Sequence, residues 1–246
     1  MAADTPAEVV RYASEVASAL SAVRADLVGV YVHGSAALGG FRAARSDVDV
    51  LAVVGGPADR SGQLAMGEAV VATAAQCPGT GLEMSVITAA TAARCGACPF
   101  EVHIRTGATG TVVVPGADHG ADPDLLLHCA VCREHGLTVY GPPAAGVFGP
   151  VPAARVRAAM ADELAWGLEH GDATYAVLNA CRALRFATDG QLCSKVDGAR
   201  WYTARHGESA VVTAALTHQL HGHSAPALPD AETFVMSLKS GEFRLS

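Results

Sequence analysis

The sequence predicts an α/β fold followed by an all-α fold. Strand-like and helix-like stretches alternate over the first 140 residues. A segment rich in proline and glycine then spans residues 141–152, and from residue 153 onward the apolar pattern is helical throughout. We therefore expect an N-terminal α/β domain over residues 1–150 and a C-terminal helical domain over residues 151–246.

The elements of the first domain follow from local patterns. Thr5 can cap an opening helix, Pro6 suits its first turn, and Glu8 completes a capping box. Apolar residues at three- and four-residue steps predict one buried face on that helix: Val9, Tyr12, Val16, Leu20 and Val23. Strands are expected at residues 28–33, 47–54, 82–88 and, shorter, 100–104; helices are expected at 60–77 and 122–136, the second terminated by Gly136.

The second domain is expected to contain five helices. Their predicted ranges are 153–170, 172–188, 195–206, 208–221 and 230–239. Gly190 would follow the second helix. Asp230 can cap the last, whose buried face would include Phe234, Val235 and Leu238.

Composition limits the classes of function. Half of the 246 residues are hydrophobic and the mean hydropathy is +0.27, which is ample for a core. We find no apolar run of eighteen residues and no secretory signal, so we expect a cytoplasmic protein without contact to a membrane. The net charge of −7 and the absence of a lysine and arginine cluster argue against nucleic-acid binding. An acidic protein instead suits a small cationic substrate.

The seven cysteines allow two interpretations. Cys95 and Cys98 form one Cys-x-x-Cys pair and Cys129 and Cys132 another, and such pairs are the usual half-sites of structural zinc. The thirty residues between the pairs exceed the usual spacing, and the second pair lies in a helical pattern where thiols pack as apolar groups. We therefore expect buried free thiols, with a zinc-stabilised binding module as the alternative.

One motif points to chemistry. Gly34-Ser35 is followed, after eleven residues, by Asp47-Val48-Asp49 in an apolar run. Glycine lets the backbone approach a phosphate, and Ser35 offers a hydroxyl and an N–H group. On a strand, Asp47 and Asp49 point to the same face, where two carboxylates suit Mg²⁺.

This motif resembles the signature of the DNA polymerase beta-like nucleotidyltransferase superfamily. Several further segments are similar to the aminoglycoside (3″)/(9) adenylyltransferases, which inactivate streptomycin and spectinomycin: residues 99–103, 122–125, 140–152, 175–182 and 188–195. Their order and spacing agree from about Val28 to Lys239. The resemblance implies a polymerase beta-like domain with a mixed sheet and flanking helices, and a C-terminal helical bundle that closes the active-site cleft.

The resemblance also implies a reaction and a set of roles. AMP would pass from MgATP to a hydroxyl of an aminocyclitol, with Asp47 and Asp49 as catalytic ligands of Mg²⁺. Glu83 would be the general base. Gly34, Ser35, Ser46 and Lys195 would bind the nucleotide, and Asp172 would contact the antibiotic.

One departure from the family pattern narrows the choice of antibiotic that would accept AMP. The resemblance implies that members that take both drugs have a tryptophan nine residues and an aspartate four residues before the position of Asp172. Here those positions hold Glu163 and Leu168, and Trp166 fits only with a local gap. Spectinomycin is therefore the expected acceptor, with streptomycin as a second candidate.

Two other functions are compatible with parts of the sequence. The same three carboxylates would serve an adenylyltransferase that acts on another small molecule or on a protein. A nucleotidyltransferase-like antitoxin or binding module would use the fold without the reaction, although the complete trio of Asp47, Asp49 and Glu83 argues against it. ATP and an aminocyclitol are the expected partners, and we expect a monomer.

Overall fold

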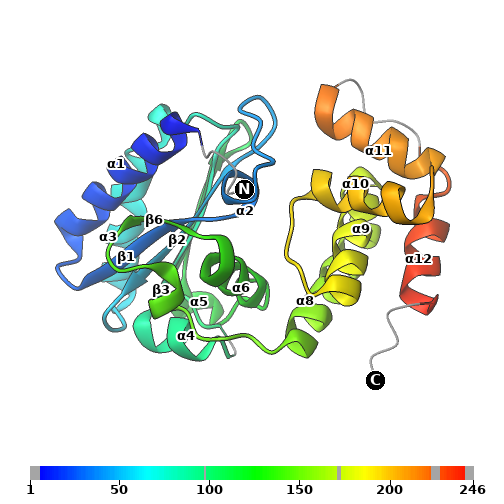
Figure 1. The fold of residues 1–246 in the computed structure, drawn as a ribbon. Coiled ribbons are helices and arrows are strands. Elements are labelled where there is room, and N and C mark those ends of the chain that lie inside the picture. Colours follow the sequence, from blue (N-terminus) through cyan, green and yellow to red (C-terminus); the bar gives the residue numbers. More distant parts are fainter. Residues whose placement is uncertain (1–5, 97, 171–172, 223–227, 242–246) are drawn as a thin grey trace. The chain divides into compact units, whose positions relative to one another are not determined.

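The computed structural model describes residues 6–96, 98–170, 173–222 and 228–241 (Figure 1). The chain divides into two compact units, Met1–Val151 and Pro152–Ser246. Each unit is described by itself below. Thr5, the expected cap of the first helix, lies outside the described residues.

The first unit is built on a mixed sheet of six strands. The strands are β1 (Leu27–Val32), β2 (Val48–Val54), β3 (Leu82–Thr88), β4 (Val102–Gly107), β5 (Gly110–Pro115) and β6 (Leu137–Tyr140). They lie in the order β5-β4-β3-β2-β1-β6. β2 and β3 are parallel, and the other neighbouring pairs are antiparallel. The expected mixed sheet is confirmed.

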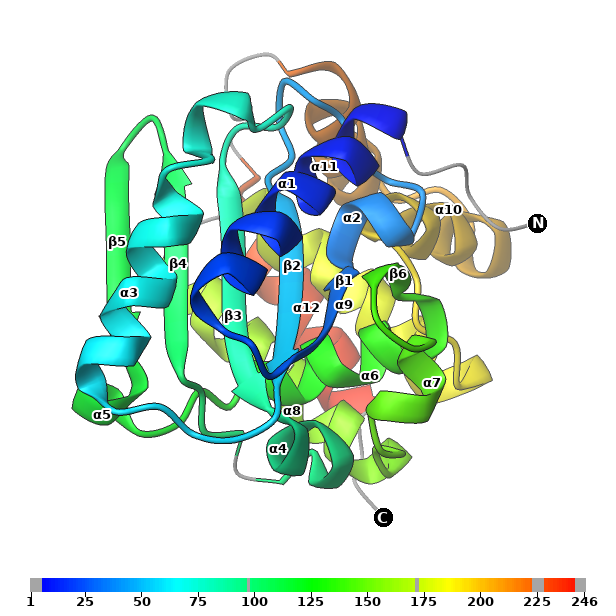
Figure 2. The same cartoon turned by 90° about the vertical axis from the view of Figure 1, so that its left-hand side faces the viewer.

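Two helices cover one face of this sheet. α1 (Ala7–Val23) and α3 (Arg60–Val71) lie side by side in front of the strands in Figure 2. Alternate strand residues pack with them into the main core, among them Val48 and Val50 of β2 and Leu82 and Met84 of β3. Because strand side chains alternate between faces, Asp49 and Glu83 must point to the opposite face.

The opposite face is covered by α6 (Leu125–His135) and by shorter elements (Figures 1 and 2). The edge-on aromatic pair of Tyr31 and Phe148 packs there with ring centroids 5.0 Å apart. The short helices of this unit are α2 (Gly34–Ala37), α4 (Ala89–Arg94), α5 (Gly116–His119) and α7 (Ala144–Val147), with one 3₁₀ turn at Ala74–Gln76.

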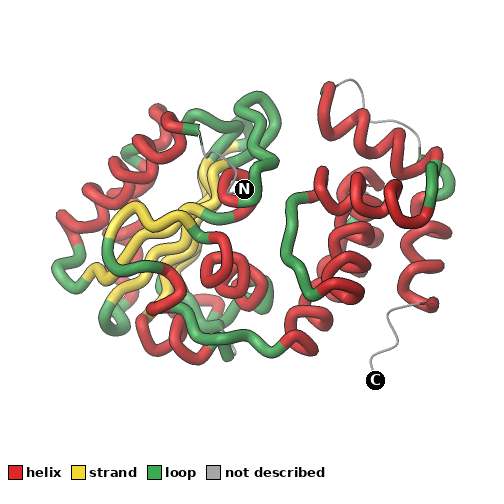
Figure 3. Tube along the Cα trace, viewed as in Figure 1, coloured by secondary structure: helices red, strands yellow, loops and turns green. Residues whose placement is uncertain are grey.

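The second unit contains helices alone in its described part (Figure 3). These are α8 (Ala153–Glu169), α9 (Ala173–Asp189), α10 (Lys195–His206), α11 (Ala210–His221) and α12 (Ala231–Gly241). α9 contacts the other four and supplies the centre of their core, with Val177, Leu178 and Cys181 fully buried. Gly190 follows α9 with φ +68°, as expected of a glycine that ends a helix.

The structure corrects four local predictions. The helix expected over residues 60–77 ends at Val71, where the Thr73 backbone N–H and hydroxyl both bond the Val70 carbonyl oxygen and tighten the chain into a 3₁₀ turn. The strand expected at 100–104 is shifted to β4. Val23, expected on the buried face of α1, is 44% exposed.

The fourth correction concerns Gly136. It is extended (φ −60°, ψ 129°) rather than left-handed. Glycine is required there for another reason, since a Cβ atom would lie 2.4 Å from the Cys132 carbonyl oxygen.

Candidate functional site

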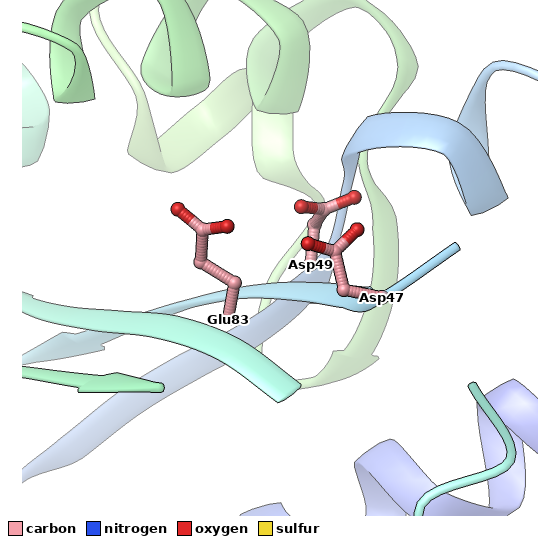
Figure 4. A group of neighbouring side chains, drawn as sticks. All are labelled: Asp47, Asp49 and Glu83. Atoms are coloured by element: carbon pink, nitrogen blue, oxygen red, sulfur yellow. The ribbon is translucent and has the colours of Figure 1, made fainter. Parts of the chain in front are cut away.

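Three carboxylates meet on the face of the sheet opposite α1 and α3. Asp47 immediately precedes β2, Asp49 is its second residue, and Glu83 lies directly across from Asp49 in the parallel register of β2 and β3. One carboxylate oxygen from each residue lies within 4.8 Å of the others. All three residues are partly exposed, and their side chains rise from the same side of the strands (Figure 4). Within the described residues this is the only such group of potential metal ligands.

The loop after β1 lies against the second of these carboxylates. Gly34 has φ +55°, and a Cβ atom there would lie 1.8 Å from Oδ2 of Asp49. The backbone N–H of Ser35 donates to the same oxygen at 3.3 Å. The glycine expected to admit a phosphate thus makes room for Asp49, and the N–H group expected to bind phosphate is held by that carboxylate.

The hydroxyl of Ser35 is buried and makes no hydrogen bond to the described part of the protein. A buried hydroxyl without a partner is costly and calls for an explanation. The Ser35 hydroxyl can therefore form a hydrogen bond with an atom of a bound ligand.

Ser46 supports the start of β2. Its Oγ accepts the backbone N–H of Arg42 at 3.1 Å, and its carbonyl oxygen accepts the N–H of Thr80 at 2.9 Å. The side chain is almost fully buried. These bonds fix the backbone just before Asp47, so Ser46 has a structural role whether or not its hydroxyl also meets a phosphate.

Sequence reasoning missed the neighbours of Glu83 on β4. Arg105 lies directly across from Glu83, and His103 lies across from Ser85, whose hydroxyl is 3.1 Å from Nδ1 of His103. Burial lowers the pKa of His103, an effect opposed by the negative charge of Glu83. The signal was present in the alternating pattern of residues 102–107, but the expected strand stopped at residue 104, one residue before Arg105.

A second group that the sequence did not reveal is a pair of histidine rings. His33, at the end of β1, lies with its ring centroid 4.8 Å from that of His128 on α6. Burial and the neighbouring His128 hold the pKa of His33 well below its ordinary value. His33 is therefore neutral at pH 7.

The expected nucleotide contact in the second unit begins α10. Lys195 follows Ser194, whose hydroxyl caps the helix by accepting the Asp197 N–H at 3.1 Å. The Lys195 ammonium lies 4.1 Å from the ring centroid of Tyr175. The Tyr175 hydroxyl donates to Glu163 at 2.7 Å, so the lysine lies over a ring that a carboxylate holds in place.

Of two residues considered for antibiotic binding, Asp172 and Trp166, the structure describes only Trp166. Asp172, the expected antibiotic contact, lies outside the described residues. Trp166 is 52% exposed, and its ring stacks on His170 with centroids 4.4 Å apart.

No helix within the described ranges is long and apolar enough to cross a membrane.

Comparisons with known proteins agree over both units. Residues 146–235 match the family described as aminoglycoside adenylyltransferase, C-terminal domain. The chain is 28% identical over 184 residues to the spectinomycin 9-adenylyltransferases of Staphylococcus aureus strains Mu50 and N315, and each alignment covers 72% of this chain and 70% of the relative.

A solved structure has the same fold. The spectinomycin adenyltransferase AAD(9) from Enterococcus faecialis, crystallised with ATP and spectinomycin, superposes with a TM-score of 0.71. The match covers 94% of this chain and 97% of that one, at 15% sequence identity.

Proposed function

We propose that the chain is an aminoglycoside adenylyltransferase that transfers AMP from MgATP to a hydroxyl group of spectinomycin, with release of pyrophosphate; the match of residues 146–235 to that family's C-terminal domain and the similarity to spectinomycin 9-adenylyltransferases support this. Adenylylation of the drug would confer resistance. The observation that carries this proposal is the group of Asp47, Asp49 and Glu83, whose carboxylate oxygens lie within 4.8 Å of one another.

The carboxylates fit a magnesium ion. Mg²⁺ prefers oxygen ligands, takes one or two carboxylates from the protein and completes its octahedron with water and substrate phosphates. Asp47 and Asp49 would hold it, since they share a strand face and are both open to solvent in part. When bound, the ion supplies charge neutralisation to the triphosphate and to the leaving pyrophosphate.

Glu83 is the general base of the proposed reaction. Its carboxylate takes the proton of the acceptor hydroxyl as the hydroxyl oxygen attacks the α-phosphorus and the bond to pyrophosphate breaks. General base catalysis of this kind contributes roughly 10²–10⁴-fold to the rate. The parallel pairing of β2 and β3 supports this role, because it holds Glu83 directly across from Asp49.

Four residues are proposed to contact the nucleotide. Ser35 would donate its unpaired buried hydroxyl to a phosphate oxygen, and Gly34 and Ser46 would form the backbone around it. Lys195 would add a positive charge, and its access to a phosphate requires release from the Tyr175 ring. Asp172 would pair with an ammonium group of the antibiotic. Residues 1–150 would form the catalytic domain, and residues 151–246 would form the domain for closure and substrate binding. The protein would act as a monomer in the cytoplasm.

Pyrophosphate release with MgATP tests the proposal directly. Wild-type protein is compared with Glu83→Gln and Asp47→Asn, each in the presence of spectinomycin or of streptomycin. Asp118→Asn is the matched control, because Asp118 is an exposed carboxylate whose salt bridge to Arg60 lies on the surface. We expect spectinomycin-dependent release in the wild type and the control, and a loss of at least about 100-fold in the two site variants.

The other outcomes are equally informative. Release with streptomycin as well would show that Glu163 and Leu168 do not exclude that drug. No release with either drug, from folded protein that binds MgATP, would overturn the antibiotic assignment and favour an adenylyltransferase with another acceptor. Release that survives both site substitutions would overturn the assignment of the carboxylates.

A further inference from the structure

Four of the seven cysteines come together in the first unit. Cys95 and Cys98 lie in the loop after α4, and Cys129 and Cys132 lie one turn apart on α6. The thiol of Cys129 lies near those of Cys95 and Cys98, and the thiol of Cys132 lies within electrostatic range of Cys95. The fold therefore joins two Cys-x-x-Cys pairs that thirty residues separate in the sequence, which removes the objection based on spacing.

Main-chain bonds hold the two pairs in this arrangement. The backbone N–H of Asp122 donates to the Cys98 carbonyl oxygen at 3.2 Å, and Pro99 forms a β-bridge with Ala121, just before α6. The Cys95 thiol donates to the Ala92 carbonyl oxygen at 3.0 Å. The first pair is thus fixed to the start of the helix that carries the second pair.

The backbone of the first pair is strained. Cys95 (φ 42°) and Cys98 (φ 52°) are the only non-glycine residues with positive φ in the described part of the chain. A side chain with a Cβ atom is disfavoured in this region. A core of apolar side chains gives no reason for a positive φ at two of four successive residues. A need to point two sulfur atoms toward a common ligand does give such a reason.

Burial of these side chains is nearly complete. Their exposed fractions are 0%, 1%, 0% and 0% for Cys95, Cys98, Cys129 and Cys132. A buried cysteine that only fills space packs equally well against a methyl group and needs no second thiol. Four buried thiols drawn from two chelating pairs are instead the ligand set of a Cys₄ zinc site.

We propose that Cys95, Cys98, Cys129 and Cys132 bind one zinc ion that ties the loop after α4 to α6. Binding converts the thiols to thiolates and releases up to four protons to solvent. The sulfur atoms must also approach one another: three or more of them do not lie within 4.8 Å in the free-thiol form, while a tetrahedron with Zn–S bonds of about 2.3 Å has edges of about 3.8 Å. Zinc binding would draw the four sulfur atoms together through rotation of their side chains.

Metal analysis of the full chain tests the proposal independently of AMP transfer. The protein is purified under reducing conditions without chelators, and its metals are counted by mass spectrometry. We expect about one zinc ion per chain. Cys129→Ser and Cys98→Ser should lose it, whereas Cys77→Ser, a change at a less buried cysteine outside the group, and Asp47→Asn, a change in the carboxylate group, should retain it.

Cobalt gives a second readout that does not depend on the variants folding. Wild-type protein produced with cobalt in place of zinc should show the intense visible and near-ultraviolet absorption of tetrahedral Co²⁺ bound to thiolates. The proposal is overturned if folded wild-type protein contains no stoichiometric zinc and takes up none from equimolar zinc chloride. It is equally overturned if the zinc stays bound in both Cys129→Ser and Cys98→Ser.

Discussion

Replacing Gly34 with alanine would test whether the position of Asp49 matters for the reaction. The new Cβ atom would lie 1.8 Å from Oδ2 and 2.3 Å from Cγ of Asp49. The carboxylate would have to retreat by about 1.6 Å to reach an ordinary contact distance of 3.4 Å. Movement of a catalytic group by about 1 Å can cost roughly 100-fold in rate. We therefore expect kcat/KM to fall by at least about 100-fold, or about 2.7 kcal/mol of transition-state stabilisation.

The backbone cost of this substitution has to be separated from the effect on Asp49. Alanine at φ +55° also loses about 1–2 kcal/mol of folding stability. Gly190→Ala is the matched control, because Gly190 has φ +68° and a Cβ atom there would meet nothing within 4 Å. Both variants should lower Tm through the backbone cost, and Gly34→Ala should lower it further because its Cβ atom also displaces Asp49.

The assay is pyrophosphate release at saturating MgATP with varied spectinomycin, alongside thermal unfolding. Gly190→Ala should keep kcat/KM within about threefold of the wild type, a difference of less than 1 kcal/mol. If Gly34→Ala keeps a similar activity, the contact between residue 34 and Asp49 has no catalytic consequence, and the assignment of Asp49 as a metal ligand loses its structural support.

Three further predictions concern stability and nucleotide binding. Burial holds the pKa of His33 in the folded protein below its value in the unfolded chain, so the folded state binds fewer protons at acidic pH. We therefore expect Tm to be constant above about pH 6.5 and to fall as the pH is lowered from there. His33→Gln should flatten this profile, and an unchanged slope would contradict the argument. Thr88→Ala removes the hydroxyl that accepts the Thr91 N–H at 3.1 Å at the start of α4, and should cost about 1 kcal/mol in urea unfolding; an unchanged midpoint would show that this cap is dispensable. Lys195→Ala should raise KM for ATP by about tenfold or more, because it removes one charged hydrogen bond worth about 1.5 kcal/mol, and Lys195→Arg should restore part of the loss. Equal KM values in the wild type and both variants would show that Lys195 does not bind the nucleotide.

Local sequence patterns were sufficient for most helices and the central strands. β3 was predicted with the bounds that the structure has, and α10 likewise, because an apolar run or a capped helical pattern is a property of neighbouring residues. The edge strands β5 and β6 were missed. β6 is only four residues long and is stabilised by pairing with β1, more than one hundred residues earlier, which no local pattern records.

The candidate site shows the same division. The chain itself determined that Asp47 and Asp49 share a face, since alternation on a strand needs no knowledge of the rest of the molecule. Only the tertiary structure decided that Glu83 lies across from Asp49, that Gly34 accommodates the Asp49 carboxylate, and that Arg105 and His103 stand beside Glu83.

The cysteines give the sharpest example of this limit. Their spacing identified two chelating pairs and, by the distance between them, argued against a common site. The contact between Cys129 and the first pair exists because α6 and the loop after α4 meet in the same unit. Sequence determines what each segment can form, from interactions over a few residues; which segments meet is decided by the packing of the whole chain, where separation along the sequence no longer measures distance in space.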